Sequence, residues 1–121
     1  MSRYLGARMH NSGRFSDDSS FRRAVEDVFA SLLEQIDELD GELDARHIPG
    51  GLTVVFEALG STFVLSQQTP THEIWLSANL RAWHFRFVDG TWVERDTTVP
   101  LLPLLSGLFS EKLGTSVEFR G

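Results

Sequence analysis

The sequence predicts an α+β protein: a two-layer α-β sandwich in which two helices flank one face of an antiparallel sheet of five to six strands. Three observations support this prediction. Apolar residues recur at three- and four-residue spacing over residues 19–39, alternate with polar residues between 52 and 95, and return to a helical pattern over 99–113. Helices and strands in this order bury their apolar faces together when both helices cover one side of the sheet. A chain of 121 residues is long enough for one such core.

The first helix is predicted from Ser19 to Leu39, with Ser19 or Ser20 as the N-cap residue. Its core face consists of apolar residues that fall on one side of a helix. They are Phe21, Val25, Val28, Phe29, Leu32, Leu33, Ile36 and Leu39.

The strands are predicted to be short and joined by tight connections, as in an antiparallel meander. Apolar and polar residues alternate in five runs, over residues 52–57, 62–66, 73–77, 83–87 and 91–95. Turns are marked by Gly50-Gly51, Leu59-Gly60 and Thr69-Pro70. Asp89-Gly90 is typical of a two-residue hairpin.

The second helix is predicted from Val99 to Leu113. Pro100 and Pro103 fall in its first turn, where a missing N–H group costs little, and Gly114 marks its end.

The composition excludes several classes of function. The chain has no Cys, so it can form no disulfide, no thiolate zinc site and no Cys-ligated iron–sulfur cluster, and it offers no thiol nucleophile. The formal charge of −6 argues against nucleic acid or an anionic membrane as the partner. No apolar run approaches the roughly 18 residues that a membrane-spanning helix needs.

Standard catalytic motifs are also missing. His72-Glu73 opens like a zincin motif, but Leu76 stands where the second His is required. Residues 37–44 are acidic, yet Leu39 occupies what would be a ligand position of an EF-hand calcium loop. An enzyme with an unrecognised His/Glu site is therefore the weakest functional hypothesis.

Charge is distributed unevenly along the chain. Residues 1–20 contain three Arg and two Asp, whereas residues 21–121 contain 8 basic and 15 acidic residues. We therefore expect a basic, disordered N-terminal segment at 1–20 and a folded domain at 21–121. The Arg- and Ser-rich segment is similar to a mitochondrial presequence, with Arg14-Phe15-Ser16 as a processing site. A disordered tail or an expression remnant is an equal alternative.

Eight carboxylates lie between Ala24 and Ala45, a stretch that contains no Lys or Arg. This acidic ridge consists of Glu26, Asp27, Glu34, Asp37, Glu38, Asp40, Glu42 and Asp44. Each pair of like charges at helical spacing destabilises the helix by roughly 0.2–0.5 kcal/mol. A hard divalent cation or a basic protein surface would offset this repulsion, and an open carboxylate surface should bind Fe²⁺ weakly and at several points. The alternative is a solvated acidic face that only confers solubility.

Alternation places Trp75 on the open face of the sheet, because Ile74 and Leu76 on either side of it face the helices. The residues expected on this face are Glu73, Trp75, Ser77, His84 and Arg86. An exposed indole is typical of protein interfaces. The alternative is that a loop or the tail from Thr115 to Phe119 covers the indole.

Residues 67–77, Gln-Gln-Thr-Pro-Thr-His-Glu-Ile-Trp-Leu-Ser, resemble the signature strand of the frataxin family. In that family Gln-x-Pro, three variable residues and Ile/Val-Trp-Leu follow in order. The likeness extends to Gly51-Leu52-Thr53-Val54, Trp83-His84-Phe85, Asp89-Gly90-Thr91-Trp92 and the acidic first helix, and covers about residues 20 to 119. The resemblance implies the same α-β sandwich that the periodicity predicts.

The resemblance also implies a function. Frataxins bind iron weakly on the acidic ridge and dock on the iron–sulfur assembly complex of cysteine desulfurase and scaffold, so this chain is expected to be an iron donor or regulator in cluster assembly. Ferroxidase activity is implied by the family alone, as are a monomeric state and oligomers formed with iron. The rival hypothesis is an acidic adaptor that docks a basic protein and for which iron is incidental.

By position, the resemblance assigns metal contact to all eight ridge carboxylates. It assigns partner contact to Trp75, Gln68, Ser66, Gln67 and His84. Eukaryotic members commonly carry Asn-Lys in place of Ser66-Gln67 and an Arg near His84, whereas His followed by an aromatic residue is more typical of bacterial members. The basic segment nevertheless favours the mitochondrial matrix as the expected location, with the bacterial cytoplasm as the alternative.

Overall fold

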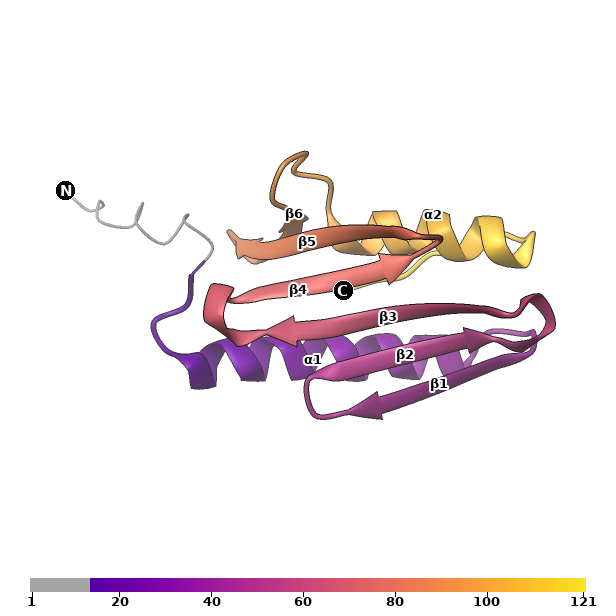
Figure 1. Ribbon diagram of the computed structural model, residues 1–121, viewed down its shortest axis with the longest axis horizontal. Coiled ribbons are helices and arrows are strands. Elements are labelled where there is room, and N and C mark those ends of the chain that lie inside the picture. The colour runs from indigo at the N-terminus through magenta and orange to yellow at the C-terminus, as the bar shows by residue number, and fades with distance from the viewer. Residues whose placement is uncertain (1–13) are drawn as a thin grey trace.

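The computed structural model describes residues 14–121 as two helices and a six-stranded sheet. The elements in chain order are α1 (Asp18–Asp37), β1 (Leu43–Ile48), β2 (Gly51–Phe56), η2 (Glu57–Leu59), β3 (Ser61–Gln68), η3 (Thr69–Thr71), β4 (Glu73–Ala78), β5 (Arg81–Val88), β6 (Thr91–Glu94) and α2 (Leu101–Leu113). The strands pair in chain order, each antiparallel to the next. Both helices lie behind the same face of the sheet (Figure 1). The predicted α+β sandwich is confirmed.

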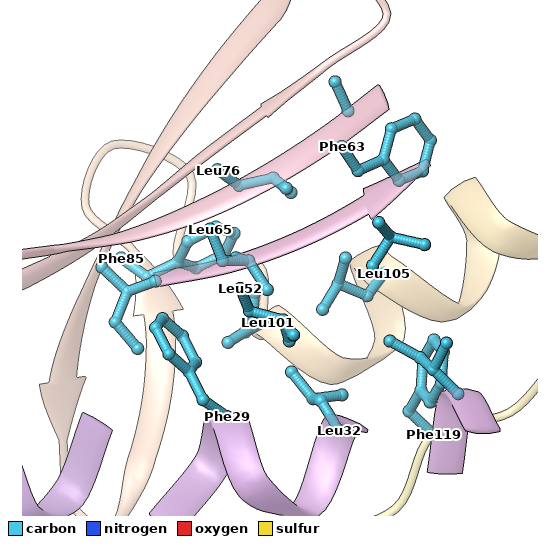
Figure 2. Packing of buried hydrophobic residues seen from close by; sticks show 14 of the residues in the cluster. Phe29, Leu32, Leu52, Phe63, Leu65, Leu76, Phe85, Leu101, Leu105 and Phe119 are labelled. Atoms are coloured by element: carbon cyan, nitrogen blue, oxygen red, sulfur yellow. The ribbon is translucent and has the colours of Figure 1, made fainter. Parts of the chain in front are cut away.

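The core lies between the helices and the inner face of the sheet. Phe29 and Leu32 of α1 approach Leu52 and Phe85 of the sheet, and Leu105 of α2 packs beside them (Figure 2). Each of these five side chains is at most 2% exposed. The inner residues of β2 to β5 are those that the period of two assigns to the core, so the strand register is also as expected.

The start of α1 differs from the sequence prediction. Asp17 is the N-cap residue, instead of Ser19 or Ser20, and its Oδ1 accepts a hydrogen bond of 2.7 Å from the Ser20 backbone N–H. Asp caps as well as Ser does, and the helix therefore begins one residue earlier than predicted. The hydrogen bonds from Ser20 hold the pKa of the Asp17 carboxyl below its ordinary value.

Residues 14–20, which the charge distribution assigned to the N-terminal segment, pack onto the domain. The Phe15 ring contacts the rings of Phe21 and Phe87, with centroids 5.6 and 5.3 Å away. The buried His72 holds this segment, because its Nδ1 accepts the Phe15 backbone N–H at 3.0 Å and its Nε2 lies 2.9 Å from Asp18 Oδ1. The remainder of the expected segment, residues 1–13, lies outside the described residues.

The β5–β6 hairpin and the start of α2 follow local backbone rules. Asp89 and Gly90 both have positive φ, +49° and +82°, as a type I′ turn requires. Helix α2 begins at Leu101, two residues later than predicted. The residue before a proline is disfavoured in a helix, so Val99 stays outside, and a β-bridge to Val93 holds Pro100 extended as the N-cap residue. Gly114 ends the helix with a φ of +70°, as predicted.

Glu94 organises the connection between β6 and α2. Its Oε1 accepts the backbone N–H groups of Asp96 and Thr97 at 3.0 and 2.9 Å and the Thr97 hydroxyl at 3.0 Å. Burial raises the pKa of the Glu94 carboxyl, but these hydrogen bonds outweigh burial and hold the pKa below its ordinary value of 4.5. The carboxylate therefore stabilises the folded state at neutral pH.

The C-terminal tail packs with the helices. Val117 and Phe119 are buried, and the Ser110 and Ser106 hydroxyls accept their backbone N–H groups at 2.8 and 2.9 Å. The Gln35 side-chain amide on α1 forms hydrogen bonds with the backbone carbonyl oxygen and N–H of Arg120, the residue after Phe119. The tail therefore does not cover the open face of the sheet. In residues 14–121, neither helix has the length and apolar character needed to cross a membrane.

Candidate functional site

The acidic ridge extends along α1, through the α1–β1 connection, to the start of β1. Six of its carboxylates are exposed: Asp27, Glu34, Asp37, Glu38, Asp40 and Glu42. None of the four ion pairs within residues 14–121 includes any of them. These six carboxylates are therefore available to a cation or to a basic surface.

The other two ridge carboxylates have partners within the protein. Glu26 Oε1 lies 2.9 Å from His47 Nε2, and its Oε2 accepts the Gly50 backbone N–H at 3.0 Å. Asp44 Oδ2 lies 3.0 Å from the Arg46 guanidinium. Glu26 thus ties α1 to the β1–β2 turn, and both residues offer fewer free oxygens than the six exposed ones.

The ridge is electrostatically unfavourable at the end of α1. Asp37 is the last residue of the helix and Glu38 its C-cap, and no basic residue lies in the last turn. The negative end of the helix dipole disfavours acidic residues there. Within residues 14–121, no three His, Asp or Glu side chains converge on a common metal position. The ridge can therefore contact a metal through scattered single carboxylates.

Trp75 lies on the outer face of the sheet, on the central strand β4, and is 37% exposed. Its indole packs against the imidazole of His84 on β5, with ring centroids 4.5 Å apart. Ser66 of β3 pairs with Trp75 on the other side and accepts a hydrogen bond of 3.2 Å from Gln68. The structure thus brings together four of the five residues expected to contact a partner.

Gln67 is the fifth of these residues and lies elsewhere. It falls between Ser66 and Gln68 on β3, so its side chain points to the opposite face of the sheet. Its side-chain amide donates a hydrogen bond of 3.2 Å to the Thr69 hydroxyl, and its backbone N–H donates to the Gly50 carbonyl oxygen at 2.9 Å.

Glu73 was expected to face water, but it is only 6% exposed. Its carboxylate accepts the Trp75 indole N–H at 2.9 Å and the Thr71 hydroxyl at 3.2 Å. Arg95 Nη1 lies 3.4 Å from both carboxylate oxygens. Three donors therefore cover a carboxylate that alternation alone would leave in solvent. Glu73 orients the indole and is itself held by Arg95. Only the strand order reveals this arrangement, because all of β5 and β6 lies between Glu73 and Arg95 along the chain.

A family model described as the frataxin-like domain matches residues 14–115. Three curated relatives are named iron–sulfur cluster assembly protein CyaY. The one from Tolumonas auensis is 31% identical over 83% of this chain and 95% of its own length. The one from Paraburkholderia phymatum is 31% identical over 84% and 95%, and the one from Pseudoalteromonas atlantica is 25% identical over 85% and 94%.

The solved structure of the frataxin from Psychromonas ingrahamii has the same fold. It superimposes with a TM-score of 0.80 at 23% identity and covers 87% of this chain and 99% of its own. The match of the family model to most of the chain confirms the resemblance carried by residues 67–77. This chain belongs to the frataxin family.

Proposed function

We propose that this protein acts in iron–sulfur cluster assembly, as an iron donor or regulator that uses two separate surfaces. The acidic ridge binds Fe²⁺, and the outer face of the sheet around Trp75 docks on the complex of cysteine desulfurase and scaffold. The names of the three curated relatives support the role in cluster assembly. The observation that carries the proposal is the separation of six exposed carboxylates from an exposed indole on the sheet.

Iron binding on the ridge is weak and distributed over several points. Carboxylate oxygens suit hard divalent ions, and Fe²⁺ stands low in the affinity order of the transition metals. Because exposed side chains form no closed cage, we expect a Kd no tighter than micromolar, on the order of 10⁻⁶ M, as for open oxygen-ligand sites. Weak binding suits a protein that delivers its metal rather than keeping it. From the family resemblance, we also propose a monomeric protein that forms oligomers with iron.

Docking on the sheet relies on Trp75 as an aromatic anchor. Interface hot spots are rich in Trp, and an indole that is already oriented by a hydrogen bond to Glu73 loses little side-chain entropy on binding. Ser66, Gln68 and His84 surround it with polar groups.

The expected location changes with the comparisons. All three curated relatives are bacterial, so the mitochondrial matrix finds no support and the bacterial cytoplasm is the location we propose.

The acidic adaptor remains the second candidate, because six exposed carboxylates also fit a basic protein surface. The two candidates differ in the role of the metal. If iron is the cargo, neutralising the ridge abolishes iron delivery and leaves iron-free docking intact. If the ridge is a docking surface, the same change weakens docking in the absence of iron.

The test uses the reconstituted desulfurase–scaffold complex with three variants. The ridge variant is Asp37→Asn/Glu38→Gln/Asp40→Asn, and the sheet variant is Trp75→Ala. The matched control is Asp96→Asn/Glu111→Gln/Glu118→Gln, which removes three exposed acids outside the ridge. We expect Trp75→Ala to lose binding and the ridge variant to lose the iron dependence of cluster formation, with the control unchanged. If the first two variants match the wild type, the proposal is wrong.

A further inference from the structure

The outer face of β4, β5 and β6 carries one carboxylate and two guanidinium groups. Glu73 on β4 pairs in register with Arg86 on β5. Arg95 directly follows β6, and its backbone N–H donates to the His84 carbonyl oxygen at 2.9 Å. The cluster therefore surrounds the Trp75–His84 pair and has a surplus of one positive charge when His84 is neutral.

Arg86 differs from Arg95 in its partners. Arg95 contacts Glu73 through Nη1, whereas none of the four ion pairs within residues 14–121 includes Arg86. Arg86 Nε is a buried nitrogen without a hydrogen-bond partner, the one such side-chain atom in that part of the chain. Buried donors are nearly always satisfied, and an unsatisfied donor on a charged group is especially costly. Such a donor is stabilised when the side chain turns toward an acceptor.

Glu73 pairs with Arg95 and not with Arg86. Its Oε1 already accepts from the Trp75 indole and the Thr71 hydroxyl, and both its oxygens face Arg95. The Arg86 guanidinium, which has no ion pair within residues 14–121, is therefore available to a carboxylate of a partner. Because the ridge is acidic and this part of the sheet is basic, the two surfaces select partner surfaces of opposite charge.

We propose that Arg86 binds an Asp or Glu side chain of the protein that docks on Trp75. This inference rests on the proposed docking function and names the chemistry of the partner: an apolar pocket for the indole with an acidic residue beside it. A guanidinium pairs with a carboxylate through two parallel N–H donors. Because Nε is covered in the free protein, the Arg86 side chain turns toward the partner on docking, a rotamer change of the kind common at interfaces.

The test compares Arg86→Gln with Arg46→Gln in titrations against the desulfurase–scaffold complex at two salt concentrations. Arg46 also lies on the outer face, but on the far edge strand β1, where it pairs with Asp44. We expect Arg86→Gln to weaken docking at least about tenfold and to reduce its salt dependence, and Arg46→Gln to stay within about twofold of the wild type. Arg86→Lys keeps the charge without the paired donors and should lose an intermediate amount. Thermal unfolding of each variant establishes that the folded protein is compared.

Two results would overturn the inference. One is docking by Arg86→Gln that matches the wild type, and the other is an equal loss in Arg86→Gln and Arg46→Gln, which would indicate general electrostatic attraction. If either occurs while Trp75→Ala abolishes docking, the inference fails and the proposed function stands. If Trp75→Ala also docks normally, the proposed function itself fails.

Discussion

Two neighbouring residues on β4 separate the core from the docking surface. Ile74 is 0% exposed, and Trp75 is 37% exposed. Replacing Ile74 by Ala removes three buried carbon atoms and leaves a cavity, which costs about 2–5 kcal/mol. Replacing Trp75 by Ala removes a half-buried ring and the indole donor to Glu73, whose carboxylate keeps the Thr71 and Arg95 donors, so we expect a smaller loss of about 1–2 kcal/mol.

The assay combines urea unfolding with a titration against the desulfurase–scaffold complex. Ile74→Ala should lower the free energy of unfolding most and dock with wild-type affinity when folded. Trp75→Ala should show the reverse, and Trp75→Phe, which keeps a ring but removes the indole N–H, should fall between Trp75→Ala and the wild type in both measurements. The reasoning is refuted if Trp75→Ala destabilises the protein as much as Ile74→Ala while the folded fraction still docks normally.

Three further predictions concern stability. Asp37→Asn/Glu38→Gln/Asp40→Asn should raise the free energy of unfolding in iron-free buffer by about 0.5–2 kcal/mol, because it relieves repulsion and an unfavourable helix-dipole interaction; a decrease in urea unfolding would contradict this. Glu94→Gln should cost about 1–3 kcal/mol at pH 7. Because the pKa of Glu94 is lowered in the folded state, the stabilisation is present above the unfolded-state value of 4.5 and is lost as pH falls through the folded-state pKa. Unfolding measured at pH 7 and at successively lower pH should show the gap to the wild type closing, and a constant gap would argue against it. His72→Asn tolerates the positive φ of 55° at this position but shortens the side chain that holds Phe15. His72→Asn should lower the free energy of unfolding by about 2–3 kcal/mol, because it removes a buried hydrogen-bonded group. It should also speed hydrogen exchange of the Phe15 amide. An unchanged exchange rate at Phe15 would show that His72 does not hold this segment.

Much of the fold could be predicted because its determinants are local. The alternation around Ile74 and Leu76 and the Asp89-Gly90 turn act over a few residues, and the structure has them as expected. The N-cap was misplaced because Asp17, Ser19 and Ser20 are all competent caps, and side-chain chemistry does not choose among them. The choice depends on Phe15 and His72, which meet only in the folded chain.

The candidate site could be predicted only in part for the same reason. The ridge and Trp75 follow from residue spacing on one element. The environment of Glu73 does not, because its donors come from Thr71, Trp75 and Arg95. Alternation with a period of two correctly predicts which face of the sheet Glu73 lies on. It does not predict that Glu73 is buried, because the covering Arg95 follows β6 and reaches β4 only in the folded sheet.

The central claim is that iron binds the acidic ridge, and an amide NMR titration with Fe²⁺ under anaerobic conditions tests it most directly. We predict that paramagnetic broadening is confined to residues between Glu26 and Asp44 and gives a Kd no tighter than about 10⁻⁶ M. The broadening should be lost in the ridge variant Asp37→Asn/Glu38→Gln/Asp40→Asn. The control triple variant at Asp96, Glu111 and Glu118 should titrate as the wild type does. A single tight site centred on His72 or His84, with the ridge signals unchanged, would contradict the account.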